Sequence, residues 1–158
     1  MDERGLFLKF WEQEKKATRN VIARIPEGST YKPDPKSRTA KELAWVIVRE
    51  EASLLDGLEK GTLEWKELPA PGTVKEILAE YDRVHQNDLK RLNAIPAAQW
   101  VAPVPMTYEG KEVMKQPGHE TAWGFLVDII HHRGQLSTYL RPMGSTVPQI
   151  YGPTADEP

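Results

Sequence analysis

The sequence contains no cysteine. This absence excludes a disulfide scaffold, a thiolate nucleophile and any zinc or iron–sulfur site built on cysteine ligands. Glycine-rich phosphate-binding motifs and the Gly-x-Ser-x-Gly motif of serine hydrolases are also missing. No apolar run approaches the roughly 20 residues that a membrane-spanning helix needs, and the charged segment 1–4 is unlike the start of a secretory signal. We therefore expect a cytoplasmic protein without a membrane partner.

The sequence has no large excess of positive or negative charge. The 158 residues carry 21 Lys and Arg against 23 Asp and Glu, a formal net charge of −2. Without a net positive field the chain is poorly suited to gather phosphates, so we expect no nucleic-acid partner. The length is that of one ordinary domain with one hydrophobic core, and residues 1–158 are expected to form a single domain.

Proline and glycine occur in clusters that divide the chain into helical blocks. Within each block, apolar residues recur every three or four positions, which is typical of a helix with one buried face. The blocks lie at about 3–25, 39–60, 73–95 and 120–140. Thr39 and Thr73 each precede a glutamate by three positions, and this spacing predicts a capping box at the start of the second and third helices.

The helical period is lost in two segments. Residues 99–118 are rich in proline and glycine, which predicts a long connection with a short hairpin around 108–110. The tail, 147–158, is rich in proline and is expected to be irregular. Because no convincing set of strands appears, the predicted fold is all-α, a bundle of four long helices with a crossing tail.

Asp128 and His132 interrupt the apolar pattern of the last helix. Residues four apart lie only about 40° from one another around a helix, so both side chains point to the same side. A carboxylate and an imidazole placed in this way can bind one divalent metal ion together. A hydrogen bond between the two side chains is the alternative interpretation of the same spacing.

Three consecutive motifs near the end of the chain resemble those of the DinB-like (damage-inducible) superfamily. They are HHRGQL at 131–136, STYLRPMG at 137–144 and VPQIYGP at 147–153. The first block with Trp11, the pair Glu42-Leu43 and the third block with His85 extend the resemblance to nearly the whole chain. It implies an up-down-down-up four-helix bundle that is usually a homodimer.

The resemblance also implies a divalent metal ion, such as nickel, zinc or manganese. In this superfamily one histidine of the second helix and two residues spaced i, i+4 on the last helix hold the metal. Asp128 and His132 match the pair on the last helix. The second-helix histidine is expected in the pattern Glu-Leu-x-His, where this chain has Trp45. An indole offers a donor only and cannot bind a metal ion.

The incomplete ligand set leaves three possibilities open. His85, which interrupts the apolar face of the third helix, is the candidate for the third ligand; a hydrogen bond to a backbone carbonyl or to Glu14 is its alternative role. A second possibility is weak binding by Asp128 and His132 with water completing the coordination. The third is a metal-free site filled by Trp45, and the missing ligand favours a site without a tightly bound catalytic metal.

Two functions follow from these possibilities. One is a bundle protein of uncertain activity whose metal site has degenerated, acting as a binding protein rather than an enzyme. The other, implied by the resemblance, is a metal-dependent thiol S-transferase, isomerase or hydrolase that uses Asp128 and His132 on a small-molecule substrate. Arg133 is expected to be structural, paired with a buried carboxylate such as Glu50 or Glu51.

Overall fold

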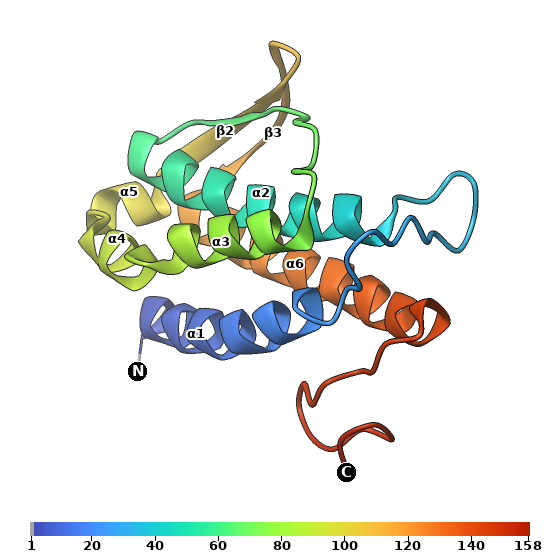
Figure 1. The fold of residues 1–158 in the computed structure, drawn as a ribbon. Coiled ribbons are helices and arrows are strands. Elements are labelled where there is room, and N and C mark those ends of the chain that lie inside the picture. Colours follow the sequence, from blue (N-terminus) through green and yellow to red (C-terminus); the bar gives the residue numbers. More distant parts are fainter. Residues whose placement is uncertain (1) are drawn as a thin grey trace.

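Four long helices form the body of the protein in the computed structural model, which describes residues 2–158 (Figure 1). They are α1 (Glu3–Ile22), α2 (Ala40–Lys60), α3 (Val74–His85) and α6 (Gly118–Leu140). Figure 1 shows α1 and α6 running in one direction and α2 and α3 in the opposite direction. The up-down-down-up order of the four helices therefore agrees with the expectation.

The helix starts follow from local chemistry. Thr39 accepts a hydrogen bond from the backbone N–H of Glu42, whose carboxylate accepts from the N–H of Thr39 in return. Thr73 begins α3 with the same reciprocal pair. Helix α6 packs against both α1 and α2, and α3 packs against the other side of α2. The core between them is formed by fully buried apolar side chains, among them Phe7, Ile22, Ile47, Leu54, Ile77, Leu126 and Leu136.

The expectation of an all-α fold is wrong in one respect, because the chain also forms a small sheet. Strands β2 (Pro103–Tyr108) and β3 (Lys111–Pro117) make an antiparallel hairpin, and β1 (Leu63–Trp65) pairs with β2 in parallel. The hairpin turn has Glu109 and Gly110 at positive φ, 49° and 75°, as a two-residue type I′ turn requires. The predicted hairpin around 108–110 is confirmed. The sequence pattern does not predict the full sheet because its strands are short, only partly buried and interrupted by proline.

The third predicted helix is divided into shorter pieces. After α3 the chain forms α4 (Asp88–Ala94) and α5 (Ala97–Val101). The break lies just before Asp88, a buried carboxylate that accepts a 2.7 Å hydrogen bond from the Trp11 indole. Pro96 then separates α4 from α5, because proline has no N–H to continue the helix.

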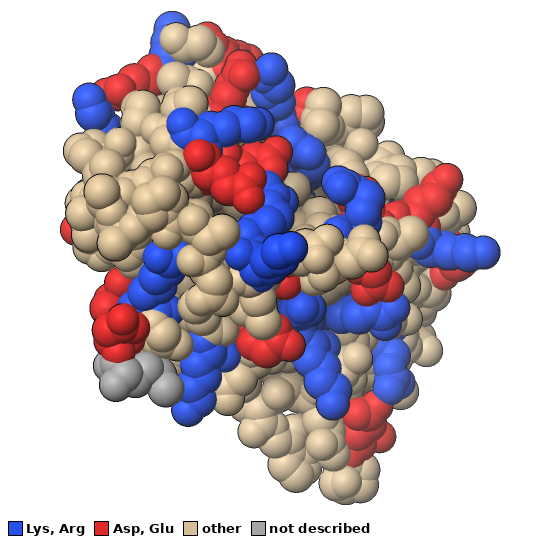
Figure 2. Space-filling view, turned by 90° about the vertical axis from the view of Figure 1, so that its left-hand side faces the viewer, with Lys and Arg blue, Asp and Glu red and all other residues tan. Residues whose placement is uncertain are grey.

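The tail after α6 is irregular, as expected. It begins with a short 3₁₀ turn, η1 (Arg141–Met143), and returns toward α1. The Tyr151 hydroxyl donates to Glu14 of α1 at 2.8 Å, and Arg24 forms an ion pair with Glu157. None of the helices in residues 2–158 has the length and apolar character needed to cross a membrane. On the face in Figure 2, basic and acidic side chains are interspersed between larger areas formed by other residues.

Candidate metal centre

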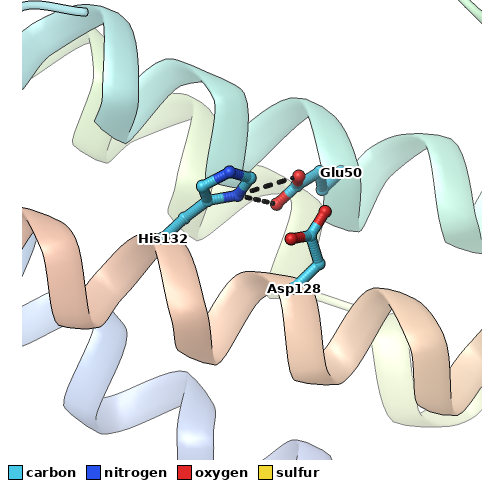
Figure 3. Close-up of side chains that lie close together, drawn as sticks. All are labelled: Glu50, Asp128 and His132. Carbon is cyan, nitrogen blue, oxygen red and sulfur yellow. Dashed lines mark hydrogen bonds and ion pairs between the residues drawn. The ribbon is translucent and has the colours of Figure 1, made fainter. Parts of the chain in front are cut away.

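Glu50, Asp128 and His132 converge at the contact between α2 and α6. Figure 3 shows Glu50 reaching down from α2 while Asp128 and His132 point up from successive turns of α6. One ligand atom from each residue can be chosen so that all lie within 4.8 Å of one another. The structure therefore brings together the two residues predicted on the last helix, and it adds a carboxylate from the second helix.

The three side chains differ in their contact with solvent. Glu50 is buried, with 5% of its surface exposed, whereas His132 is partly buried and Asp128 is exposed. The site is thus anchored in the protein interior on the α2 side and opens outward along α6. An arrangement closed on one side and open on the other is typical of sites that bind an exchangeable ligand.

Burial shapes the electrostatics of the site. His132 Nδ1 lies 3.0 Å from Glu50 Oε1 and 3.1 Å from Oε2. Removal of Glu50 from water raises the pKa of its carboxyl to about 7, a rise that His132 opposes and Asp128 reinforces. The hydrogen bond to Glu50 raises the pKa of the His132 imidazole. The Glu50 carboxyl is therefore only partly ionised at neutral pH.

The chemistry of the three side chains shows whether they suit a metal ion. Two carboxylates and one imidazole are ligands that zinc, manganese and related divalent ions accept. A cation between them would favour the ionised form of the buried Glu50 carboxylate. The donor types and their convergence fit a divalent metal ion.

A cavity of about 550 Å³ lies directly beside the three residues. Its walls come from α2, α6 and the small sheet, and most of the lining is apolar. The apolar lining residues are Val46, Trp65, Met106, Met114, Phe125 and Val127. Arg38, Glu67, Gln116 and Thr121 supply further polar groups. The volume is that of a small-molecule site rather than a gap in packing.

His85 does not join this centre. It lies on the opposite side of α2, where its Nδ1 is 2.8 Å from the Tyr81 carbonyl and its Nε2 is 3.2 Å from Glu51 Oε2. Burial lowers the pKa of His85, but Glu51, the Tyr81 carbonyl and Asp88 together raise it, and the net shift is upward. The hydrogen bond to a backbone carbonyl agrees with the alternative interpretation, although Glu51 and not Glu14 is the second partner.

Trp45 does not fill the site either, so the expectation that an indole occupies the metal position is wrong. Its Nε1 donates to the Leu68 carbonyl at 3.1 Å, and its ring lines a neighbouring cavity. Val46 is the residue of α2 that faces the centre one turn before Glu50. Val46 and Glu50 are four residues apart and lie about 40° from one another around the helix, so they share a side. Trp45 and Glu50 lie about 140° apart, so Trp45 faces another way.

Glu50 is the candidate ligand that the sequence interpretation missed. It was considered as a partner for Arg133, but that role belongs to Glu14, which is buried and forms the ion pair with Arg133. The available signal was a pair of adjacent glutamates in the middle of an apolar helix. Burying a carboxylate is costly unless it has a partner, so each glutamate of this pair pointed to a specific polar contact.

The comparisons with known proteins agree with this architecture. Residues 1–158 match the DinB family. The chain belongs to the DinB family. This DinB protein is 26% identical over 158 residues to the uncharacterized protein YrdA of Bacillus subtilis (strain 168), covering 96% of this chain and 89% of YrdA.

Two solved DinB-like structures share the fold. A DinB-like protein from Bacillus cereus ATCC 10987 superposes with a TM-score of 0.73 at 24% identity, covering 92% of this chain and 95% of that one. YjoA, a DinB-like protein from Bacillus subtilis, gives a TM-score of 0.70 at 17% identity, covering 92% and 96%. Both matches cover 92% of this chain, whose fold is mostly helical with a small sheet.

Proposed function

We propose that Glu50, Asp128 and His132 hold a divalent metal ion and that the protein is a metal-dependent transferase or hydrolase acting on a small molecule. The observation that supports the proposal is the position of Glu50, which supplies from α2 the ligand that was thought to be missing. With three ligands the site no longer depends on His85 or on water to reach the number typical of catalytic zinc centres.

Zinc and manganese fit the donor set better than nickel does. Zinc accepts imidazole and carboxylate together, and manganese favours carboxylate oxygen. Three protein ligands leave a coordination position free for a further molecule. A metal ion bound there would lower the pKa of a coordinated water or thiol and so supply a nucleophile at neutral pH.

The residues around the centre have separate roles in this proposal. Glu50 is fixed by burial and keeps its carboxylate at the inner side of the site. In the metal-free protein the hydrogen bond to Glu50 orients the His132 ring toward the site. Asp128 lies at the solvent-exposed side and would hold the metal ion next to the open coordination position. The apolar wall around Met106, Met114 and Phe125 binds the carbon skeleton of a substrate and excludes water.

We also propose that the protein is a homodimer that associates through α1 and α6. Apolar side chains remain exposed on these helices: Leu6 by 42%, Phe10 by 39% and Val127 by 61%. Phe10 contacts Trp123 edge to face, with ring centroids 5.9 Å apart, so the exposed groups of the two helices are connected. A sedimentation measurement at the mass of two chains supports the dimer, and the mass of one chain refutes it.

Metal binding is tested by equilibrium dialysis of chelator-treated protein against zinc or manganese, followed by elemental analysis. The proposal predicts about one ion per chain for the wild type and a clear loss for Glu50→Gln and His132→Gln. Retention of the metal in both variants would show that it binds elsewhere. Metal well below one ion per chain in the wild type would favour the non-catalytic bundle protein instead.

A further inference from the structure

A second cavity, of about 750 Å³, lies at the start of α2. It is enclosed by the loop 29–38, the first turns of α2 and the segment 67–72, which lie together at the end of the bundle where α2 begins (Figure 1). Four cationic side chains line it: Lys32, Lys36, Arg38 and Lys41. Two carboxylates line it as well, Glu42 and Glu67, so the lining has a formal excess of positive charge.

Both carboxylates already have partners. Glu42 accepts hydrogen bonds from the backbone N–H of Thr39 at 2.7 Å and from the Thr39 hydroxyl at 2.9 Å. These bonds lower the pKa of Glu42 and keep it ionised within the helix cap. Glu67 lies 3.8 Å from Arg38, and both side chains are more than half exposed. The capping box also occupies the N–H groups of Thr39 and Glu42, so the basic side chains, not these N–H groups, would attract an anion.

Three of the four cations have no acidic partner among the described residues. Lys32 donates to the Pro35 carbonyl and Lys41 to the Gly72 carbonyl, both at 2.9 Å. Lys36 is exposed, and within residues 2–158 only its backbone N–H forms a hydrogen bond. These ammonium groups can therefore turn toward a bound anion without breaking an ion pair.

Trp45 forms an aromatic wall of this second cavity, in contrast to the role expected from its position in the sequence. Its indole is held by the 3.1 Å hydrogen bond to the Leu68 carbonyl. Arg38, Val46 and Glu67 line both the second cavity and the cavity beside Glu50, so the two spaces adjoin. A ligand in the second cavity can therefore extend toward the candidate metal centre.

We propose that the second cavity binds the phosphate or carboxylate end of an organic anion whose adjoining ring or apolar group packs on Trp45. This inference rests on the proposed function: the anion is the substrate, and its other end reaches the cavity beside Glu50, Asp128 and His132. The lysine ammonium groups supply the attraction as point charges, and the Trp45 ring supplies a flat apolar surface.

Phenyl phosphate is the probe, because it combines an anion with an aromatic ring. We expect it to shift the Trp45 indole N–H resonance of the metal-free, ¹⁵N-labelled full chain in a saturable manner, with Trp45→Phe assigning the signal. Lys36→Gln combined with Lys41→Gln should weaken binding at least fivefold, and added salt should weaken it further. Lys9→Gln combined with Lys90→Gln removes two exposed cations on α1 and α4 and should leave the affinity unchanged.

Two comparisons make the result decisive. Phenol, which lacks the charge, should not saturate the site, and parallel titration with benzoate distinguishes a carboxylate ligand from a phosphate ligand. Glu50→Gln should bind phenyl phosphate as the wild type does, so loss of the metal site alone leaves this result intact. Absence of a saturable shift, or equal weakening by the Lys9 and Lys90 substitutions, would overturn the proposal.

Discussion

His132 Nδ1 lies 3.0 Å from Glu50 Oε1, although the two residues are 82 positions apart in the sequence. The contact joins the two helices that form the largest helix–helix interface of the bundle. It places an imidazole and a buried carboxylate at the inner end of an apolar cavity. The proposed metal centre depends on this contact, because Glu50 is the ligand that α6 cannot provide.

The first prediction concerns the affinity for metal. Glu50→Gln, Asp128→Asn and His132→Gln should each lower zinc affinity in calorimetric titration by more than about tenfold, since even loss of a residue behind a ligand costs that much. Glu51→Gln is the matched control, because Glu51 is the neighbouring buried glutamate but faces His85. Equal losses in Glu50→Gln and Glu51→Gln would indicate a general disturbance of α2 and not a lost ligand.

The second prediction concerns the pH dependence of metal-free stability. The pKa of Glu50 is raised from 4.5 to about 7 in the folded protein, so the folded state binds a proton more tightly than the unfolded state. The stabilisation that the folded protein gains from holding this proton is fully present below pH 4.5 and is lost as the pH rises through 7. The raised pKa of His132 acts in the same direction.

Urea unfolding in the presence of a chelator measures this effect. Between about pH 5 and about pH 8 the wild type should lose roughly 1–3 kcal/mol more unfolding free energy than Glu50→Gln does. The carboxyls whose pKa is lowered, such as Glu42 and Asp82, titrate below this window and do not contribute. Identical pH profiles for the two proteins would contradict the electrostatic description of Glu50.

The third prediction contrasts two glycines of α6. A Cβ at Gly118 would lie 2.9 Å from the Trp100 carbonyl oxygen, so Gly118→Ala should destabilise the fold by about 1–3 kcal/mol. A Cβ at Gly134 would meet no atom within 4 Å, and Gly134→Ala should stabilise the helix by about 0.5–1 kcal/mol. Thermal unfolding of both variants checks the contrast. The open space beside Gly134 shows that no neighbouring helix requires a glycine at this position.

The fourth prediction concerns the buried ion pair of Arg133 with Glu14. Both residues are at most 5% exposed, so Arg133→Met leaves an unpaired buried carboxylate and should cost about 3–5 kcal/mol in chemical unfolding. Arg19→Met, which breaks an exposed pair with Asp82, should cost less than about 1 kcal/mol. If Glu14→Gln does not recover part of the loss in the Arg133→Met background, the unpaired charge is not its cause.

Local signals predicted much of the fold. Thr39 and Thr73 marked two helix starts, and Gly110 marked the hairpin, because capping and positive φ depend on neighbouring residues alone. Asp128 and His132 were found for the same reason, since residues four apart on one helix must share a side. The parallel pairing of β1 with β2 links residues more than 40 positions apart, and no local pattern specifies it.

Glu50 could not be assigned from the sequence, because its role depends on how α2 is rotated within the bundle. One residue along a helix is a turn of about 100°, so Glu50 faces α6 while Glu51 faces α3 and His85. The sequence shows two buried glutamates but not which one faces which helix. The family resemblance points to position 45, but the residue of α2 that faces the site is Val46. The two positions differ by one residue, again a turn of about 100°.

Anomalous diffraction tests the central claim most directly. Crystals of the full chain grown with zinc and measured on both sides of the zinc absorption edge should show one strong anomalous peak within coordination distance of Glu50, Asp128 and His132, at about 2.0–2.2 Å from their ligand atoms. A peak bound by other residues, or none in crystals whose zinc exceeds the protein concentration, would contradict the metal centre proposed for this protein.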